Sequence, residues 1–405
     1  MKILFVSPYV PSPIRVRPYS FLRTLVRRGN QVTLICQADS RDVAAVAALR
    51  ELGVYVVTVA VGRLSMLWNV VRAVPGALPF QAALGFSAQM LDAIRHEVRR
   101  GNYDIAHIEH LRASALGYGL VDLPTVLDAV DSISLLFERT LRGSPTLKSR
   151  LMALVDLART RAYEREYANR FEQIIISSPE DAWALDVLAG SPDTPVATVI
   201  SNGVDLDYFA PQMVERAPAT LVFSGKMSYH ANEAAVLFLV NEIMPLVWQQ
   251  RPDVRVCIAG SSPTAAVRAL ADDARVDVTG YLPDLRPILA AATIAVCPLR
   301  YGVGIQNKVL EAMAMATPVI AARQVSRALS ACDGDDLVLA GQPHEYAHAI
   351  VSLLADPDRA HRIGRSGRVY VERYHNWENS TARLESIYRE AIARFNQRHL
   401  LSTRY

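Results

Sequence analysis

The sequence has 405 residues, of which 51% are hydrophobic and 20% are charged, and its formal net charge is +3. This length favours two domains over one, and the apolar fraction can fill two large cores. A charge this close to neutrality argues against nucleic acid as a partner. The four cysteines are far apart and lack the spacing of metal ligands, so we interpret them as thiols in a reducing compartment.

The beginning of the chain does not resemble a signal peptide, because Ser7 and Pro8 follow the apolar residues 2–6 at once. We find no apolar run in the sequence that is long enough to span a bilayer. We therefore expect a cytoplasmic enzyme.

Short apolar runs alternate with helical segments in the first half of the chain. We expect strands at 2–6, 31–36, 55–59, 103–108, 125–128 and 173–178, and helices at 19–28, 44–52, 63–74, 86–99, 147–168 and 179–188. The alternation predicts a mainly parallel sheet covered by helices. The helix at 147–168 is expected to carry its charges on one face.

The predicted helix at 63–74 is amphipathic and rich in large apolar residues, including Leu67, Trp68 and Val71. Packing on the domain core is the favoured interpretation of this pattern. Contact with a membrane surface is the alternative if the substrate is linked to a lipid.

Titratable residues lie at the end of the strand near residue 108. Strand alternation puts His107 and Glu109 on one face, with His110 at the mouth of the following loop. His107 fits a buried core histidine, whereas Glu109 and His110 are the candidates for a ligand site.

Three further residues occupy places where open α/β sheets bind ligands. Asp128 and Asp131 follow a strand and could contact a substrate hydroxyl, although Asp131 or Ser132 could instead cap the next helix. Arg17, at the end of the loop 7–18, suits a phosphate or a carboxylate, with a plain surface arginine as the alternative.

The pattern restarts after residues 210–219, a polar stretch with two prolines that we interpret as a linker. Strands are expected at 221–223, 255–259, 276–279, 292–297 and 319–322, and helices at 234–247, 308–315, 344–354, 357–372 and 377–394.

The stretch after the strand at 292–297 predicts an anion site. A loop with glycines, residues 300–304, leads to a helix for which Asn307 is a plausible N-cap and in which Lys308 and Glu311 share a face. Free backbone N–H groups and the helix dipole favour phosphate there. A second basic loop, Gly225-Lys226, follows the strand at 221–223. An ordinary βαβ unit with solvated lysines is the alternative.

The run Gly304-Ile305-Gln306-Asn307-Lys308-Val309-Leu310-Glu311-Ala312-Met313 resembles the donor segment of the retaining glycosyltransferases of family 4. More narrowly, it resembles a branch tied to bacterial exopolysaccharide and exosortase-type gene neighbourhoods. The resemblance implies the GT-B fold, in which two doubly wound, Rossmann-like α/β domains face a central cleft. The acceptor-side domain would be residues 1–205 with a return helix at 377–405, and the nucleotide-sugar domain would be residues 220–376.

The resemblance also implies site roles. Lys226 and Lys308 would act on the donor diphosphate, Glu311 would bind the ribose, and Glu109 and His110 would serve the acceptor side. The remaining donor-binding candidates are Gly225, Tyr281, Gly304, Ile305, Gln306, Asn307, Val309 and Leu310, with Arg17, Asp128 and Asp131 as acceptor or phosphate candidates. No metal and no cofactor are expected beside the nucleotide diphosphate sugar.

The family's usual pair of glutamates, with seven residues between them, is incomplete. The place of the first glutamate falls on Val303 or Tyr301, depending on the alignment, and neither is acidic.

The expected function is metal-independent, retaining transfer of a hexosyl-type sugar to a carbohydrate or lipid-linked acceptor in polysaccharide biosynthesis. Contact with the inner membrane face stays open. A nucleotide-sugar epimerase and a catalytically silent partner subunit are the alternatives.

Overall fold

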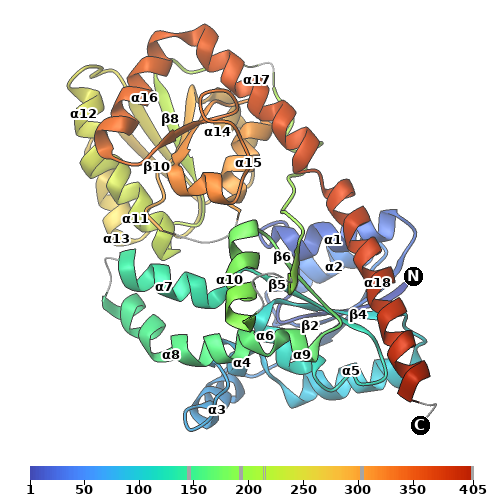
Figure 1. Ribbon diagram of the computed structural model, residues 1–405. Coiled ribbons are helices and arrows are strands. Elements are labelled where there is room, and N and C mark those ends of the chain that lie inside the picture. Colours follow the sequence, from blue (N-terminus) through green and yellow to red (C-terminus); the bar gives the residue numbers. More distant parts are fainter. Residues whose placement is uncertain (144–146, 191–194, 213, 215, 302–304, 403–405) are drawn as a thin grey trace. The chain divides into compact units, whose positions relative to one another are not determined.

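The computed structural model describes residues 1–143, 147–190, 195–212, 214, 216–301 and 305–402 (Figure 1). The chain forms two compact units. Unit 1 comprises Met1–Glu138, Arg150–Ser201 and Trp377–Tyr405, and unit 2 comprises Arg139–Ser149 and Asn202–Asn376.

Unit 1 is built on a seven-stranded sheet whose strand order is β3-β2-β1-β4-β5-β6-β7. Every pairing in it is parallel. The strands are β1 (Lys2–Ser7), β2 (Gln31–Gln37), β3 (Tyr55–Val59), β4 (Ile105–Glu109), β5 (Thr125–Val130), β6 (Gln173–Ile176) and β7 (Ala197–Val199). The central strands are short runs buried on both faces, as is usual in parallel sheets, whereas the edge strands β3 and β7 are partly exposed.

Two hydrophobic cores cover the two faces of this sheet. One core receives α1 (Val16–Arg27), α2 (Val43–Glu51) and α18 (Trp377–Ser402), and the buried Trp377 ring packs edge-on against Phe21. The other core receives α5 (Ala88–Arg100), α6 (His110–Gly117), α9 (Tyr167–Arg170) and α10 (Pro179–Ala189). The remaining helices are α3 (Arg63–Ala73), α4 (Phe80–Gly85), α7 (Ile133–Gly143) and α8 (Leu147–Arg165), and the last two have residues in both units.

Unit 2 has a six-stranded sheet of order β10-β9-β8-β11-β12-β13, again with only parallel pairings. Its strands are β8 (Thr220–Ser224), β9 (Arg255–Ala259), β10 (Val276–Gly280), β11 (Ile294–Cys297), β12 (Val319–Ala322) and β13 (Val338–Ala340). Its α-helices are α11 (His230–Phe238), α12 (Met244–Trp248), α13 (Ala265–Ala269), α14 (Arg286–Ala291), α15 (Asn307–Ala314), α16 (Pro343–Ala355) and α17 (Pro357–Tyr374). Short π or 3-10 segments follow three elements: η1 (Leu239–Ile243), η2 (Leu270–Asp272) and η3 (Arg323–Arg327).

The predicted class, two doubly wound α/β domains, is confirmed, but some boundaries differ. Helix α1 begins at Val16, so Arg17 lies in its first turn and not in the preceding loop. The helix expected at 86–99 begins later, because Ser87 caps α5 by accepting a hydrogen bond from the Met90 N–H. The N-cap of α15 is Gln306, and Asn307 is its first helical residue, so the predicted cap was wrong by one position.

Among the described residues, one helical stretch is long and apolar enough to cross a membrane by length and composition. It is His230–Trp248, formed by α11, η1 and α12, and 61% of its most apolar window is buried inside the protein. Burial of this kind is what a core helix of a folded domain shows.

Each sheet has one place where the strand order reverses. In unit 1 the chain runs outward from β1 through β2 to β3 and then restarts on the other side of β1 with β4. In unit 2 the same reversal separates β8 from β11. Ligands of open α/β sheets bind beyond the carboxyl ends of the strands at such a point.

Candidate functional site

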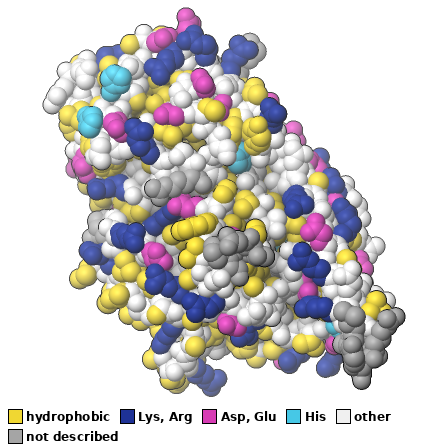
Figure 2. Space-filling view, viewed as in Figure 1, with side chains coloured by type: hydrophobic (Ala, Val, Ile, Leu, Met, Phe, Trp, Pro, Cys, Tyr) yellow, Lys and Arg dark blue, Asp and Glu magenta, His cyan; other side chains and the backbone are white. Residues whose placement is uncertain are grey.

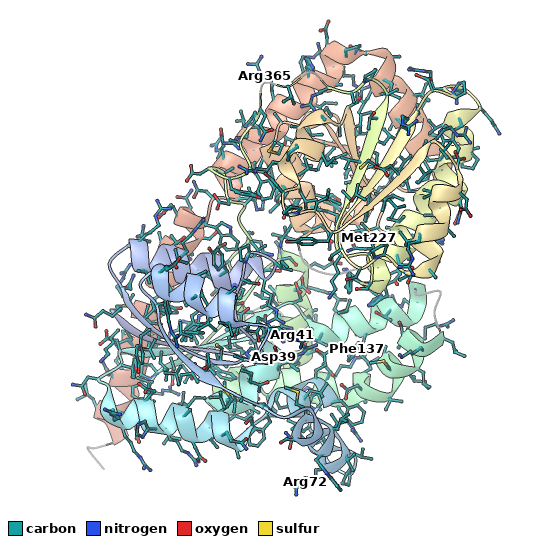
Figure 3. The ribbon with its side chains drawn as sticks, turned by 180° about the vertical axis from the view of Figure 1, so that it is seen from behind. Asp39, Arg41, Arg72, Phe137, Met227 and Arg365 are labelled. Carbon is teal, nitrogen blue, oxygen red and sulfur yellow. The ribbon has the colours of Figure 1, made fainter. Side chains whose placement is uncertain are left out.

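The reversal in unit 2 brings two lysines together. Lys226 follows β8, Lys308 is the second residue of α15 after β11, and β8 and β11 are hydrogen-bonded neighbours. Figure 3 shows Met227, next to Lys226, at the end of the strands of this sheet. Only four of the 43 Lys and Arg residues of the chain are lysines, so two of the four lie at this one sheet edge. A lysine is a compact point charge that suits a phosphate group.

The side chain of Asn232, in α11, joins the two lysine-bearing segments. Its Nδ2 donates a hydrogen bond of 3.0 Å to the backbone carbonyl of Lys226, and its Oδ1 accepts one from Lys308 Nζ. Asn232 is buried, whereas the Lys226 side chain is exposed. We call Gly225, Lys226, Asn232, Lys308 and Glu311 the lysine site.

Close backbone approach at this site requires glycine at two positions. Gly225 has φ +151°, and a Cβ there would lie 2.8 Å from Asn232 Nδ2 and 3.3 Å from Lys308 Nζ. A Cβ at Gly260 would lie 1.8 Å from the Gly225 carbonyl oxygen. A side chain at Gly225 would therefore crowd the Lys308 amine, and one at Gly260 would displace the Gly225 backbone.

Burial changes the proton affinity of both charged groups on α15. It lowers the pKa of Lys308, an effect that Cys297 and Glu311 oppose. It raises the pKa of Glu311 to about 7, against the lowering effect of Lys308. A diphosphate beside Lys308 would stabilise its ammonium form, because an opposite charge favours the ionised state.

The other donor-binding candidates differ in how far their side chains are exposed. Tyr281 is 69% exposed and follows Gly280, the last residue of β10. Asn307 accepts a hydrogen bond of 3.3 Å from Asn202 through its side chain. The side chains of Ile305, Val309 and Leu310 are buried in the core, so only the backbone of these residues could meet a ligand. Gln306 is partly buried, and Gly304 lies outside the described residues.

Tyr301 occupies one of the two places to which the missing glutamate aligns. Its buried ring stacks on the ring of His230 with centroids 5.4 Å apart, and its hydroxyl lies 2.9 Å from His230 Nδ1. The other place, Val303, lies outside the described residues.

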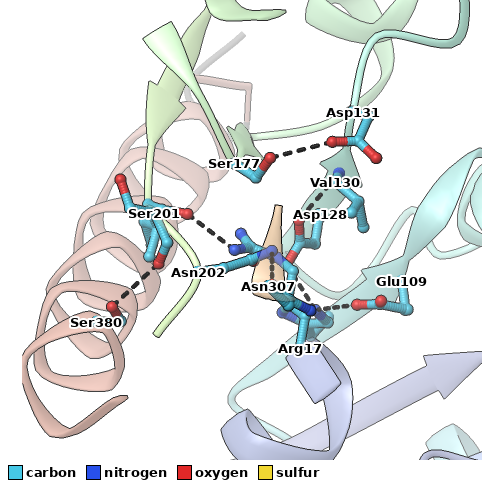
Figure 4. Close-up of polar contacts among 12 residues, drawn as sticks. Arg17, Glu109, Asp128, Val130, Asp131, Ser177, Ser201, Asn202, Asn307 and Ser380 are labelled. Atoms are coloured by element: carbon cyan, nitrogen blue, oxygen red, sulfur yellow. Dashed lines mark hydrogen bonds and ion pairs between the residues drawn. The ribbon is translucent and has the colours of Figure 1, made fainter. Parts of the chain in front are cut away.

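The reversal in unit 1 holds a buried polar cluster. Asp128 in β5 accepts a hydrogen bond of 2.7 Å from Arg17 Nε, and Arg17 Nη1 donates one of 2.8 Å to the Ile200 carbonyl (Figure 4). Glu109 is the register neighbour of Asp128 on β4. We call Arg17, His107, Glu109 and Asp128 the acid cluster; all four are buried.

Alternation places His107 and Glu109 on one face of β4, as predicted, with His107 Nε2 3.6 Å from Glu109 Oε2. The His107 ring stacks on Phe5 at 4.1 Å, and its Nδ1 lies 2.8 Å from the Tyr388 hydroxyl of α18. Burial lowers the pKa of His107 to about 4 and raises that of Glu109 to about 7, against the lowering effect of Arg17. At neutral pH the histidine is therefore uncharged, and Glu109 exchanges between its acid and its ionised form.

The remaining candidates of unit 1 are tied to nearby backbone and side chains. His110 has φ 68°, and its Nδ1 accepts a hydrogen bond of 3.2 Å from the Arg112 N–H, while burial lowers its pKa to about 3. Asp131 accepts a hydrogen bond of 3.1 Å from Ser177, and burial together with Asp181 raises its pKa to about 7. Ser132, and not Asp131, caps α7, because its Oγ accepts from the Leu135 N–H.

One group of described residues could hold a metal ion by geometry: the ligand atoms of His107, Glu109 and Asp128 lie within 4.8 Å of one another. However, the Arg17 guanidinium already lies on the Asp128 carboxylate. A divalent cation would sit against this fixed positive charge, so the cluster fits a metal poorly.

Sequence reasoning missed Asn232 as the link between the lysines and Tyr388 as the partner of His107. Asn232 had a usable signal, since it lies in the helix that follows the Gly225-Lys226 loop. Tyr388 had none, because 281 residues separate it from His107.

Two family models match the chain. One, described as Glycosyltransferase Family 4, covers residues 16–208, and the other, described as Glycosyl transferases group 1, covers residues 218–356. The D-inositol 3-phosphate glycosyltransferase of Gordonia bronchialis is 25% identical over 93% of this chain and 83% of its own length. The alpha-maltose-1-phosphate synthase of Mycobacterium tuberculosis is 30% identical, over 50% of this chain and 59% of the relative.

Solved structures with the same fold cover nearly the whole chain. Sucrose-phosphate synthase from Thermosynechococcus elongatus superimposes with a TM-score of 0.71 over 97% of this chain and 99% of its own, at 16% identity. Anabaena HepE in complex with UDP and glucose has a TM-score of 0.66 over 96% and 99%, at 16% identity. The protein thus carries a glycosyltransferase family 4 domain followed by a glycosyl transferases group 1 domain, the domain pair of a GT-B glycosyltransferase.

Proposed function

We propose that the chain transfers a sugar, with retention of anomeric configuration, from a nucleotide diphosphate sugar to a carbohydrate or lipid-linked acceptor. The observation that carries the proposal is the lysine site, where Asn232 links the Lys226 backbone to the Lys308 ammonium beside Gly225. Solved HepE structures are described as complexes with UDP and with UDP-glucose, which makes uridine diphosphate sugars the first donors to test.

In this proposal the lysines stabilise the leaving group. Negative charge grows on the diphosphate as the glycosidic bond breaks, and charges that are already in position lower that barrier. Lys226 supplies an exposed charge, Lys308 one that Asn232 holds in place, and the first turn of α15 adds the helix dipole. Glu311 would bind the ribose hydroxyls, and Tyr281 would lie beside the base.

No metal or cofactor is assigned to this reaction, because two lysines can neutralise a diphosphate. On the acceptor side we assign Arg17, Glu109, His110, Asp128 and Asp131. Of these, Glu109 and Asp131 have pKa values raised to about 7, which suits them to hold or release a proton near neutrality.

The test is donor binding followed by transfer. Nucleoside diphosphates and their sugars, screened by thermal shift, should raise the melting temperature, since a ligand at about 100 times its Kd adds about 2.7 kcal/mol to stability. A labelled donor identified in this way should then pass its sugar to an acceptor from an exopolysaccharide-producing cell extract.

The epimerase alternative predicts a different outcome. An epimerase would convert the nucleotide sugar without any acceptor, so incubation of donor and enzyme alone, followed by chromatography of the nucleotide sugar, distinguishes the two. If no nucleotide sugar binds at all, the proposal is wrong and the silent-subunit alternative gains support.

A further inference from the structure

Helix α8, which belongs to unit 1 from Arg150 onward, buries polar side chains and exposes apolar ones. Its buried face carries Asp156, Thr160 and Glu164 beside Ala153. The face toward solvent carries aliphatic side chains: Leu151, Met152, Leu154 and Val155. Charges were expected on one face of this helix, but two acidic residues are buried while four large apolar side chains are exposed. Exposure of so much apolar surface is unfavourable in water.

The buried carboxylates of α8 accept hydrogen bonds from backbone N–H groups, which explains why they are buried. The Asp156 carboxylate accepts a bifurcated hydrogen bond from the Phe80 N–H at the start of α4, with 3.1 Å to each oxygen. Glu164 accepts from the backbone N–H groups of Ile133 and Ser134 at the start of α7. Both carboxylates serve as helix-terminus anions. The exposed aliphatic residues have no comparable explanation inside the unit.

Helix α3 has the same character. Leu67, Trp68 and Val71 on this helix, and Val74 just after it, are all more than half exposed. Their spacing puts them on one face. The interpretation of this segment as a helix packed on the core was therefore wrong for these side chains.

The exposed faces of α3 and α8 belong to one surface of unit 1. Arg159 of α8 donates hydrogen bonds to the carbonyls of Ala73 and Val74 at the end of α3, and its guanidinium lies 4.6 Å from the Phe80 ring centroid. Figure 2 shows hydrophobic and basic side chains side by side at the lower left, over these helices. We call the exposed residues Leu67, Trp68, Val71, Arg72, Val74, Arg150, Leu151, Met152, Leu154 and Val155 the apolar–basic face.

The charges of this face have one sign. Residues 62–91 contain two arginines and no Asp or Glu, and residues 139–155 contain three arginines and one lysine and no Asp or Glu. The Arg72 and Arg150 side chains are exposed, and Figure 3 shows Arg72 projecting away from the unit. The first acidic residue of α8, Asp156, is buried.

We propose that the apolar–basic face docks on an anionic lipid bilayer, with the aliphatic and tryptophan side chains in the headgroup–acyl boundary. Apolar area and basic charge both add to such binding. Tryptophan favours this boundary, and arginine reaches its phosphates from an apolar helix face. A folded protein partner or a second copy would not need two segments whose charged residues are all basic, which is why the charge pattern favours a lipid surface. The proposal goes beyond the sugar transfer and does not depend on it.

The first test is sedimentation of the full-length protein with phosphatidylcholine vesicles, with and without phosphatidylglycerol. We expect binding to the anionic vesicles that weakens as salt is added. The double variant Arg72→Glu/Arg150→Glu should weaken it by roughly fivefold or more for each arginine. Charge reversal at the exposed Arg99 of α5 is the matched control and should have little effect.

The second test reports on the tryptophan. Trp68 and Trp183 are 62% and 64% exposed, so they differ in location and not in exposure. Trp68→Ser should reduce vesicle binding and Trp183→Ser should not. Lipids brominated on the acyl chains should quench wild-type fluorescence, and Trp68→Phe should abolish this quenching while Trp183→Phe retains it.

Lack of binding to anionic vesicles overturns the proposal, as does binding that the Trp183 variant loses as readily as the Trp68 variant. Self-association that disappears in Trp68→Ser, without vesicle binding, would assign the face to a second copy. Because no donor or acceptor is present, these results are independent of the proposed transfer, and Lys226→Ala should bind vesicles like the wild type.

Discussion

The lysine site and the acid cluster lie at equivalent places in their sheets, yet they hold opposite kinds of charge in opposite surroundings. At the lysine site the Lys226 side chain is exposed, and Gly225 and Gly260 have no side chain that would cover the loop backbone. In the acid cluster Arg17, His107, Glu109 and Asp128 are all buried, and one guanidinium partly offsets the carboxylates.

The difference shows how one fold position serves two tasks. An exposed cationic edge attracts a soluble anion and has little to lose in stability when its charge is removed. Burial of a charged network changes the proton affinities of its members. Removal of one member should destabilise the unit, because the remaining charge is then buried without a partner and without water. Substitutions in the two regions should therefore separate stability from activity.

The largest effect is expected at Arg17. Arg17→Met keeps an unbranched stem but leaves the buried Asp128 carboxylate without its guanidinium, so unit 1 should lose about 3–5 kcal/mol of stability. Urea unfolding followed by circular dichroism measures this. Arg27→Met, at a more than half-exposed position of the same helix, is the control and should change stability by about 0–1 kcal/mol. Equal melting of the two variants would show that the acid cluster is not held by Arg17.

Lys226→Ala should have the opposite effect: it should reduce activity and leave stability unchanged. The side chain is exposed, so the melting temperature should stay unchanged. The activation barrier for transfer should rise by about 2.7–4 kcal/mol, which is the usual effect of removing a group that stabilises charge in a transition state. Lys148→Ala, at another exposed lysine, is the control in the same rate assay. Activity within about threefold of wild type would remove Lys226 from the mechanism.

Glu311 sharpens the comparison because it is a partly buried carboxyl inside the cationic site. Glu311→Gln should reduce nucleotide affinity by about 1.5–3 kcal/mol for each ribose hydrogen bond that loses its charge, and Glu311→Ala should reduce it further. Stability should barely change. Calorimetric titration of the nucleoside diphosphate measures the affinity, with Glu242→Gln on the unit surface as the control. Wild-type affinity in both Glu311 variants would mean that the assigned donor site is wrong.

The smallest effect is a pH slope caused by Glu109. Its folded-state pKa of about 7 exceeds the ordinary value of about 4.3, so the folded protein binds an extra proton between these pH values. Its contribution to stability therefore falls as pH rises through this window, by at most about 1.4 kcal/mol per pH unit. Glu109→Gln should flatten the slope but leave the contributions of Asp131 and Glu311, whose pKa values are also raised to about 7. Urea unfolding at pH values from about 5 to about 8 would detect the change.

Glu345 is the control for this measurement, because its pKa is shifted in the direction opposite to that of Glu109. The Gly341 N–H and Arg323 lower its pKa to about 2, so it stays ionised across the same range. Glu345→Gln should shift stability by an amount that does not vary with pH there. A wild-type slope that persists in Glu109→Gln would assign the proton uptake to another buried carboxyl.

The sequence by itself determined the two α/β units and the approximate position of the lysine site. Apolar runs separated by helical periods specify parallel strands and covering helices, since this pattern depends only on local spacing. The sequence also placed Gly225 and Lys226 after one strand and Lys308 after another, and strand alternation predicted that His107 and Glu109 share a face. These inferences need only neighbours along the chain.

Only the tertiary structure decided which of these residues meet. Lys226 and Lys308 share Asn232 because β8 and β11 are neighbours in the sheet, and strand order is a property of the whole unit. Tyr388 reaches His107 because α18 packs on the sheet of unit 1, and no local pattern records that contact. The apolar face of α8 is exposed because its opposite face carries Asp156 and Glu164, whose buried carboxylates accept hydrogen bonds from the first N–H groups of α4 and α7. Periodicity identifies the faces of a helix, but the partners available in the fold decide which face is buried.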